Sequence, residues 1–328
     1  MTSALTCRRF PALFPAHRCR WLLLAVLLLL ALLARAGESA RVHLLVPNNG
    51  GVFRELYLEL DAQLKPRGIE LGLIELEHGV SALPHSELFI AAGPESLMYL
   101  LRSPDSHTPI LSLLNTQETL EHARAQLSTQ RDLSAIYYDP EPARQLRLIR
   151  AVLPRAERIG VFMGPGRDDD IRELERLAAE AGLVLNLEVV ASEQELLSTL
   201  PGLLTRSDTL LAIPDARIIT RQSLKALLLT AYRFNRVLIG SSEAMVNAGS
   251  LASTHSTPSQ IAHQSADWVI AALTHTPAKL PAPGYAKDFD VAVNRQVARS
   301  LGIPVPEAAE LKQILQAANA PPVGVVTP

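Results

Sequence analysis

The sequence predicts an α/β fold made of two Rossmann-like lobes, each with a mainly parallel sheet covered by helices. Short apolar runs alternate with amphipathic stretches of about 10–15 residues, which is typical of βαβ units. The alternation restarts near Leu133, and a short strand-helix-strand pattern returns near the C-terminus. We therefore expect a hinge that the chain crosses more than once. The expected divisions are 41–133 plus 246–280 in lobe 1, 134–245 plus 281–318 in lobe 2, and a flexible tail over 319–328.

The strands and helices before residue 133 are predicted from the spacing of apolar residues and from the turn residues between them. Apolar runs of strand length end at Gly, Pro or Asn, and the stretches between them have helical spacing. The predicted strands span 41–46, 69–76, 87–92 and 109–114, and the predicted helices span 52–65, 97–101 and 117–126.

The elements from residue 133 onward continue the same alternation. Three acids open the helix at Asp168, at the positive end of its dipole, and Gly182 follows its last turn. The predicted strands span 133–138, 158–163, 183–190, 209–213, 237–240, 249–254 and 289–293. The predicted helices span 141–152, 168–181, 192–204, 220–234 and 259–274, with a last helical stretch from 295.

The first 36 residues have the pattern of a secretory signal. Basic residues precede a 14-residue apolar run over 21–34, and Ala34-Arg35-Ala36 forms an A-x-A cleavage site. The run is shorter than the roughly 20 residues of a membrane-spanning helix. We expect cleavage after Ala36 and a periplasmic protein. An uncleaved N-terminal anchor is the second interpretation, because the run is very rich in leucine.

Composition narrows the function of the remaining 292 residues. All 33 acidic residues but only 26 of the 31 basic residues lie after Ala36, so the net charge there is −7. An acidic chain with scattered charges argues against nucleic-acid binding, which needs a basic face. Both cysteines, Cys7 and Cys19, lie in the leader, so we expect neither a disulfide nor a thiolate metal site in the remaining chain. We also expect the protein to act as a monomer.

The motifs that would indicate an enzyme or a cofactor are missing from the sequence. There is no G-x-S-x-G or Walker A motif, and Gly164-Pro165-Gly166 has Asp169 where a dinucleotide-binding loop needs glycine. The histidines show no H-x-H or H-x-x-x-H pairing, so we expect no metal and no cofactor. An extracytoplasmic enzyme is therefore the weakest of the alternatives.

The candidate binding residues follow the predicted strands. Ligands of open α/β sheets bind outside the carboxyl ends of the strands, where helix N-termini also favour anions. We expect Asp215 to hold a ligand amine and Ser96 a carboxylate. The predicted ligand-binding residues are Asn48, Asn49, Gly93, Ser96, Asn115, Thr116, Gly164, Asp168, Asp215, Ser242 and Glu243.

Four stretches resemble the substrate-binding proteins of ABC transporters with the type I periplasmic-binding fold, closest to the family that includes tryptophan- and tyrosine-binding components. They are 87–96 (ELFIAAGPES), 145–164 (QLRLIRAVLPRAERIGVFMG), 213–215 (IPD), and the C-terminal pattern Val293-Asn294, Ala298, Leu301-Gly302-Ile303 and Pro306. The resemblance implies a protein that captures a small polar ligand, amino-acid-like or an organic anion, by hinge closure. It also implies an ABC permease of the inner membrane as the partner.

The chain departs from this family at several site positions. Gly93-Pro94 replaces Gly-Thr, Asn115-Thr116 replaces Asp-Pro, and Asp168-Asp169 replaces Asn-Ser. Thr254-His255-Ser256 stands where the family has aromatic residues. These changes leave open the alternative of a divergent accessory or sensor subunit of an envelope membrane complex, with little or no solute binding.

Overall fold

The computed structural model describes residues 41–103, 107–126 and 131–317, and all structural statements below concern these residues. The predicted leader (1–36) and tail (319–328) lie outside them. No helix in the described ranges combines the length and apolar character needed to span a membrane.

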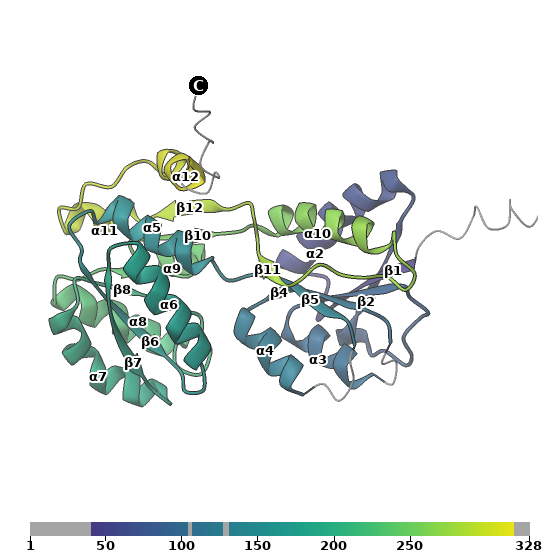
Figure 1. Cartoon of the computed structure of the whole chain (residues 1–328), viewed down its shortest axis with the longest axis horizontal. Coiled ribbons are helices and arrows are strands. Elements are labelled where there is room, and N and C mark those ends of the chain that lie inside the picture. Colours follow the sequence, from purple (N-terminus) through teal and green to yellow (C-terminus); the bar gives the residue numbers. More distant parts are fainter. Residues whose placement is uncertain (1–40, 104–106, 127–130, 318–328) are drawn as a thin grey trace, which may run out of the picture. The chain divides into compact units, whose positions relative to one another are not determined.

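The first lobe is built on a six-stranded sheet in the order β11-β5-β4-β3-β1-β2, with every pair parallel. β3 is buried over all five residues, which explains its unbroken apolar sequence LFIAA. α2 and α10 pack on one face, and α3 and α4 cover the other (Figure 1). The bounds are β1 Arg41–Val46, α2 Gly51–Leu64, β2 Glu70–Glu75, β3 Leu88–Ala92, α3 Pro94–Arg102, β4 Ile110–Asn115, α4 Gln117–Ala125, β5 Leu133–Tyr137, α10 Pro258–Ala272 and β11 Gly284–Tyr285, with 3₁₀ turns at Lys65–Arg67 and Leu76–His78.

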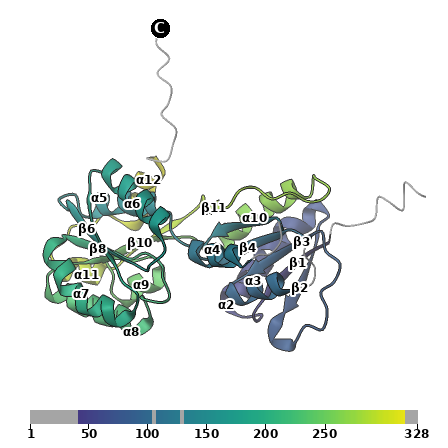
Figure 2. The same ribbon diagram turned by 60° about the horizontal axis from the view of Figure 1, so that its bottom comes forward.

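The second lobe contains a sheet in the order β12-β10-β9-β8-β6-β7, in which only β12 runs antiparallel to its neighbour. Its strands lie between α5, α6 and α12 on one side and α7 and α8 on the other (Figure 2). The bounds are α5 Pro142–Val152, β6 Arg158–Met163, α6 Asp168–Glu180, β7 Val184–Val189, α7 Glu193–Arg206, β8 Thr209–Leu211, α8 Arg221–Arg233, β9 Leu238–Ile239, α9 Glu243–Ala248, β10 Ala252–His255, β12 Asp290–Val293, α11 Arg295–Ser300 and α12 Ala308–Ala317.

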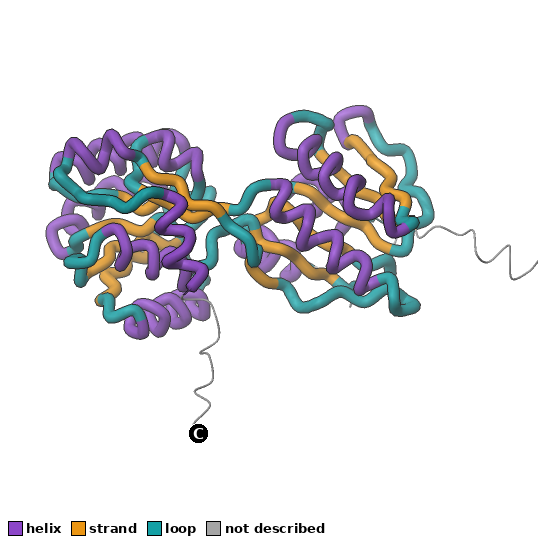
Figure 3. Tube along the Cα trace, turned by 90° about the horizontal axis from the view of Figure 1, so that it is seen from above, coloured by secondary structure: helices purple, strands orange, loops and turns teal. Residues whose placement is uncertain are grey.

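Three segments of the described chain connect the lobes, namely 138–141, 256–257 and 286–289. Loops form these connections, and each follows directly on a strand (Figure 3). Two of them are bonded to each other, because the Ser256 hydroxyl donates to the Asp288 carbonyl over 2.7 Å. Arg144 of α5 donates to the Ala286 carbonyl over 3.2 Å and lies 4.2 Å from the centre of the Phe289 ring.

Sheet membership moves the lobe boundaries away from the expected ones. β5 pairs with β4 in the first sheet, although residues from 134 onward were assigned to lobe 2. β10 pairs with β9 and β12 in the second sheet, although 246–280 was assigned to lobe 1. β11 pairs with β5 in the first sheet, although 281–318 was assigned to lobe 2. The physical reason is that backbone pairing between distant segments, rather than a local break in the pattern, decides which sheet a strand joins.

Candidate functional site

The carboxyl edges of both sheets contribute to two neighbouring cavities. The larger has a volume of about 600 Å³ and the smaller about 300 Å³. Asp139 and Pro214 line both, so the two spaces meet at the first connecting segment and at the loop after β8. This is the position at which open α/β sheets bind ligands.

Hydroxyl and carboxylate groups from both lobes line the larger cavity. α2 and the start of α4 contribute from the first lobe, and the loop after β9 contributes from the second. The segment between β10 and α10 completes the wall. The lining residues are Val52, Glu55, Thr116, Tyr138, Asp139, Pro214, Ser241, Ser242, Glu243, Ala244, His255, Ser256, Thr257 and Pro258.

The smaller cavity combines apolar walls with a polar rim. Met163, Leu174 and Ile213 form part of its apolar wall in the second lobe. On the rim, the Tyr137 and Tyr285 rings meet edge to face with centroids 5.1 Å apart, and the Tyr285 hydroxyl donates to Gln117 Oε1 over 2.6 Å. Such a pocket is suited to the apolar part of a small ligand.

Asp139 is the acid shared by the two cavities. Its Oδ2 accepts the backbone N–H of Gln117, the first residue of α4, over 2.7 Å. Burial raises the pKa of Asp139 to about 7, although this hydrogen bond and the positive charge of Arg167 oppose the increase. A carboxylate in this position is poorly hydrated and gains from a positive neighbour.

Tyr138 lies beside Asp139 and is 39 % exposed. Burial raises the pKa of its phenol, and the negative charges of Glu55 and Glu243 add to the increase, so a carboxylate from each lobe lies near this ring. Glu243 Oε2 is 3.8 Å from His255 Nε2, while Nδ1 of His255 is buried without a hydrogen-bond partner among the described residues.

Asp215 does not present a free carboxylate. It is only 3 % exposed and accepts three hydrogen bonds from Arg217, from the backbone N–H over 3.0 Å, from Nε over 3.1 Å and from Nη2 over 2.9 Å. Burial raises the pKa of Asp215, but the hydrogen bonds and charge of Arg217 outweigh it and hold the pKa below its usual value. Nη2 of Arg217 also lies 3.1 Å from Glu118 Oε1 of the first lobe.

The carboxyl edge of the first sheet carries buried polar atoms that have no partner in the described chain. Ser96 is fully buried with its hydroxyl unpaired, and Asn115 is 2 % exposed with Oδ1 unpaired. The Oδ1 atom of Asn49 is also buried and unpaired. Gly93 has φ +82°, and a side chain there would press on the Phe53 ring, so this turn requires glycine.

The structure gathers three of the predicted residues in the larger cavity: Thr116, Ser242 and Glu243. Thr116 and Ser242 also cap their helices, accepting from the backbone N–H of Thr119 and Met245. The remaining predicted residues line neither cavity. They are Asn48, Asn49, Gly93, Ser96, Asn115, Gly164, Asp168 and Asp215.

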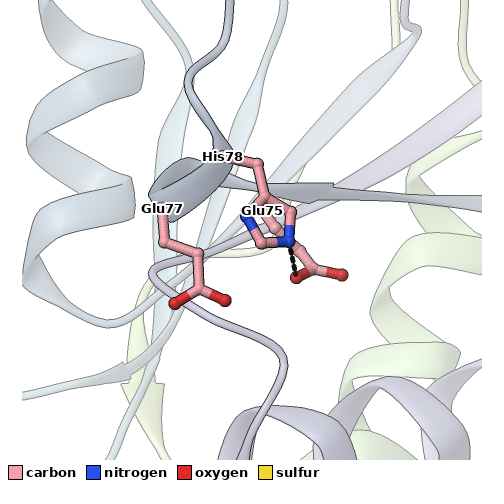
Figure 4. A group of neighbouring side chains, drawn as sticks. All are labelled: Glu75, Glu77 and His78. Atoms are coloured by element: carbon pink, nitrogen blue, oxygen red, sulfur yellow. Dashed lines mark ion pairs between the residues drawn. The ribbon is translucent and has the colours of Figure 1, made fainter.

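A separate cluster of possible metal ligands consists of Glu75, Glu77 and His78 (Figure 4). One ligand atom from each lies within 4.8 Å of the others, and His78 Nε2 is 3.4 Å from Glu75 Oε2. Glu77 and His78 are exposed, and none of the three lines either cavity. We therefore assign no function to this cluster.

Comparison with known families decides what kind of protein carries this site. The family described as "ABC transporter substrate binding protein" matches residues 139–316, more than half of the chain. The chain belongs to the ABC transporter substrate-binding protein family. Members of this family bind small solutes and deliver them to permeases. The predicted resemblance and the solute-binding function are thereby confirmed.

Solved structures share the fold of this substrate-binding protein. A Streptococcus pneumoniae domain described in complex with L-Trp has 18 % identity and a TM-score of 0.57, covering 84 % of this chain and 98 % of that one. A conserved domain protein from Vibrio cholerae has 20 % identity, a TM-score of 0.57 and the same coverage. A ligand-free, open substrate-binding protein with adhesive properties from Clostridium difficile has 15 % identity and a TM-score of 0.63, covering 82 % and 96 %.

These neighbours confirm the predicted two-lobed α/β fold of type I periplasmic binding proteins. A search of curated protein sequences finds no match to the chain.

Several lining residues of this substrate-binding protein are absent from the sequence-based set. Tyr138 and Asp139 lie in the first connecting segment, and His255 and Ser256 lie at the second. Asp139 falls between the predicted strand over 133–138 and the predicted helix over 141–152, and Thr254-His255-Ser256 stands out in the sequence only as a departure from the family pattern. The signal that identifies them is their position at the end of β10 or directly after β5 and β10, where the chain passes between lobes.

Proposed function

We propose that this protein is the periplasmic receptor of an ABC importer, which captures a small polar solute between its lobes and presents the closed form to an inner-membrane permease. The observation that carries the proposal is the shared acid Asp139, which lies on a connecting segment and lines both cavities. A ligand at this point touches both lobes and the hinge.

Hinge closure requires contacts that exist only when both lobes engage the ligand. The larger cavity offers such contacts, because Glu55 and Thr116 come from the first lobe while Ser242 and Glu243 come from the second. Three polar contacts already join the lobes, one of them from Gln260 Nε2 of α10 to Asp290 Oδ2 of β12 over 3.1 Å. Gln117 Nε2 donates to Asp170 Oδ1 over 3.1 Å, and Arg217 pairs with Glu118.

Periplasmic location and the permease partner rest on the predicted leader and on family membership. The leader over 1–36 fits export, with an uncleaved anchor as the other possibility. The proposal includes action as a monomer and no catalytic step. Among the residues predicted from the sequence, it takes Thr116, Ser242 and Glu243 as ligand contacts, because they line the larger cavity.

A thermal-shift screen of the purified protein against amino acids, organic anions, amines, sugars and nucleosides tests the proposal. A ligand at 100 times its dissociation constant stabilises the native state by about 2.7 kcal/mol. A protein of this size then melts several degrees higher, at about 2–4 °C per kcal/mol. Tyr138→Ala should remove the shift, whereas Tyr232→Ala, an exposed tyrosine on α8, should preserve it.

A flat screen with a cooperative melt would contradict the receptor proposal. It would favour the accessory-subunit alternative, to which the internal pairing of Asp215 with Arg217 lends support.

A further inference from the structure

Acidic side chains outnumber basic side chains in the lining of the larger cavity. Its carboxylates are Glu55 from α2, Asp139 from the first connecting segment and Glu243 from α9. None of its lining residues is lysine or arginine, and His255 is the only basic side chain among them. A ligand that enters this space therefore meets negative charge from both lobes and from the hinge.

The two guanidinium groups near these cavities, those of Arg217 and Arg167, are already occupied. Arg217 is bound to Asp215 and Glu118, and Arg167 donates to Asp170 over 2.7 Å and to the Pro214 carbonyl over 3.2 Å. An anion at these guanidinium groups would have to displace a carboxylate of the protein.

The N-terminus of α4 is occupied as well. Asp139 accepts the Gln117 N–H over 2.7 Å, and the Thr116 hydroxyl accepts the Thr119 N–H over 3.1 Å. Helix N-termini bind anions through such free N–H groups. Here a carboxylate of the protein already fills that role, so α4 offers little to an anionic ligand.

The acids of the larger cavity, in contrast, lack strong cationic partners in the described chain. Glu243 has only His255, at 3.8 Å. Asp139 makes no ion pair in the described chain, and the charged or titratable groups that influence it are Arg167, Glu118, Asp170, Tyr137 and Tyr285. Tyr138, which is 39 % exposed, adds an aromatic ring to the same lining as Glu55 and Glu243, and an aromatic ring with carboxylates suits an ammonium group.

We propose that the ligand is an organic ammonium ion without a carboxylate, held at Tyr138 by Glu55, Asp139 and Glu243, with a short apolar body that enters the neighbouring cavity lined by Met163, Leu174 and Ile213. This inference rests on the proposed receptor function and narrows its ligand class. In this proposal the ligand amine is neutralised by Asp139, Glu55 and Glu243 instead of by Asp215. The reason is that Arg217 already neutralises Asp215.

Isothermal titration with matched compounds tests the ligand class. One set is tyramine, tyrosine and 3-(4-hydroxyphenyl)propionate; the other is choline, glycine betaine and the neutral isostere 3,3-dimethylbutan-1-ol. At pH 8 we expect tyramine or choline to bind at least about tenfold more tightly than its carboxylate-bearing and neutral counterparts, a difference of about 1.4 kcal/mol.

Two variants and a control locate the site of the bound cation. Glu55→Gln and Glu243→Gln should each weaken binding about twofold to fivefold, as expected for half-exposed ion pairs, and the double variant about tenfold. Glu157→Gln should leave binding unchanged, because Glu157 precedes β6 at the opposite edge of the second sheet. Binding of the cation should also strengthen from pH 6 to pH 8 as Asp139 ionises, and Asp139→Asn should remove that dependence.

The outcomes separate this inference from the receptor proposal. The inference is overturned if tyrosine or 3-(4-hydroxyphenyl)propionate binds as tightly as tyramine, or if glycine betaine binds as tightly as choline. The receptor function would still stand. Cation binding that is unaffected by the Glu55/Glu243 double variant overturns the proposed position. If no compound in these sets or in the wider screen binds, both proposals fail.

Discussion

At the scale of single residues, the site depends on how two acids are neutralised. Asp215 is buried with three hydrogen bonds from Arg217, whereas Asp139 is held by one backbone N–H and makes no ion pair in the described chain. The pKa of Asp215 is accordingly lowered and that of Asp139 raised. Two acids near one cleft thus have pKa values shifted in opposite directions.

Asp139 predicts a pH dependence of stability. Its pKa is about 7 in the folded protein and near its ordinary value of 3.8 in the unfolded chain, so between these values the native state holds the extra proton. Stability from this group therefore falls as pH rises from about 4 to 7. We expect the melting temperature of Asp139→Asn, relative to wild type, to rise from pH 5 to pH 8. Asp267→Asn, an exposed acid on α10, should show no such trend.

Gly164 predicts a steric effect on the other acid. A Cβ at this position would overlap the Asp215 carboxylate and the Arg217 guanidinium. We expect Gly164→Ala to lower the free energy of unfolding by about 1–3 kcal/mol, as overpacking does, measured by urea denaturation. Gly202→Ala is the matched control, because Gly202 is exposed inside α7 and should gain up to about 1 kcal/mol. Equal effects at both positions would contradict the close packing around Asp215.

At the scale of elements, one buried side chain joins α5 to the strand ends of the second sheet. Gln145 Nε2 donates to the Gly240 carbonyl over 2.6 Å, and its Oε1 accepts from both the backbone N–H and the hydroxyl of Thr254 over 3.1 Å. α5 begins directly after the first connecting segment. Gln145 therefore fixes the hinge end of α5 against β9 and β10.

Replacing Gln145 tests this connection. Gln145→Leu would leave the Gly240 carbonyl and the Thr254 N–H buried without partners, at about 1–3 kcal/mol for each unsatisfied group. We expect a loss of about 2–4 kcal/mol in chemical denaturation. Gln313→Leu, on the exposed side of α12, should change stability by less than about 0.5 kcal/mol. A small loss at Gln145 would show that water replaces these bonds.

At the scale of the whole molecule, the lobes are joined by the connecting segments and by the contacts Gln117–Asp170, Arg217–Glu118 and Gln260–Asp290. Burial, together with the negative charge of Asp215, raises the pKa of Glu118. The Arg217–Glu118 pair is partly exposed, so it contributes at most about 1 kcal/mol. That magnitude is enough to bias a hinge equilibrium without locking it.

Glu118→Gln should therefore change ligand affinity without a ligand contact being lost. We expect up to about a fivefold decrease in affinity if the pair supports the ligand-bound arrangement, with less than about 1 kcal/mol lost in stability. Titration calorimetry and urea denaturation give the two values. The control is Glu180→Gln, which removes one acid from the exposed ion pairs of Arg176 on α6. It should leave both ligand affinity and the free energy of unfolding nearly unchanged. An unchanged affinity in Glu118→Gln would mean that the pair has no part in binding.

The sequence by itself determined the fold class, the family and nearly every main element, because buried parallel strands and amphipathic helices have strong local periodicity. The leader over 1–36 stays a prediction. β1 and β6 coincide with their predicted ranges. Two-residue β11 and six-residue α9 carry too little periodicity to predict, and the stretch from Arg295 is two helices, α11 and α12.

Tertiary structure alone decided the lobe membership of β5, β10 and β11, since strand pairing is a contact between distant segments. It also decided which acids face the cavities. Asp215 and Asp139 have similar sequence contexts, each beside a proline after a strand. Asp215 pairs with Arg217, two residues further along the same loop. Only the tertiary structure places Asp139 at the junction of two cavities, because these cavities form between segments that are distant in the sequence.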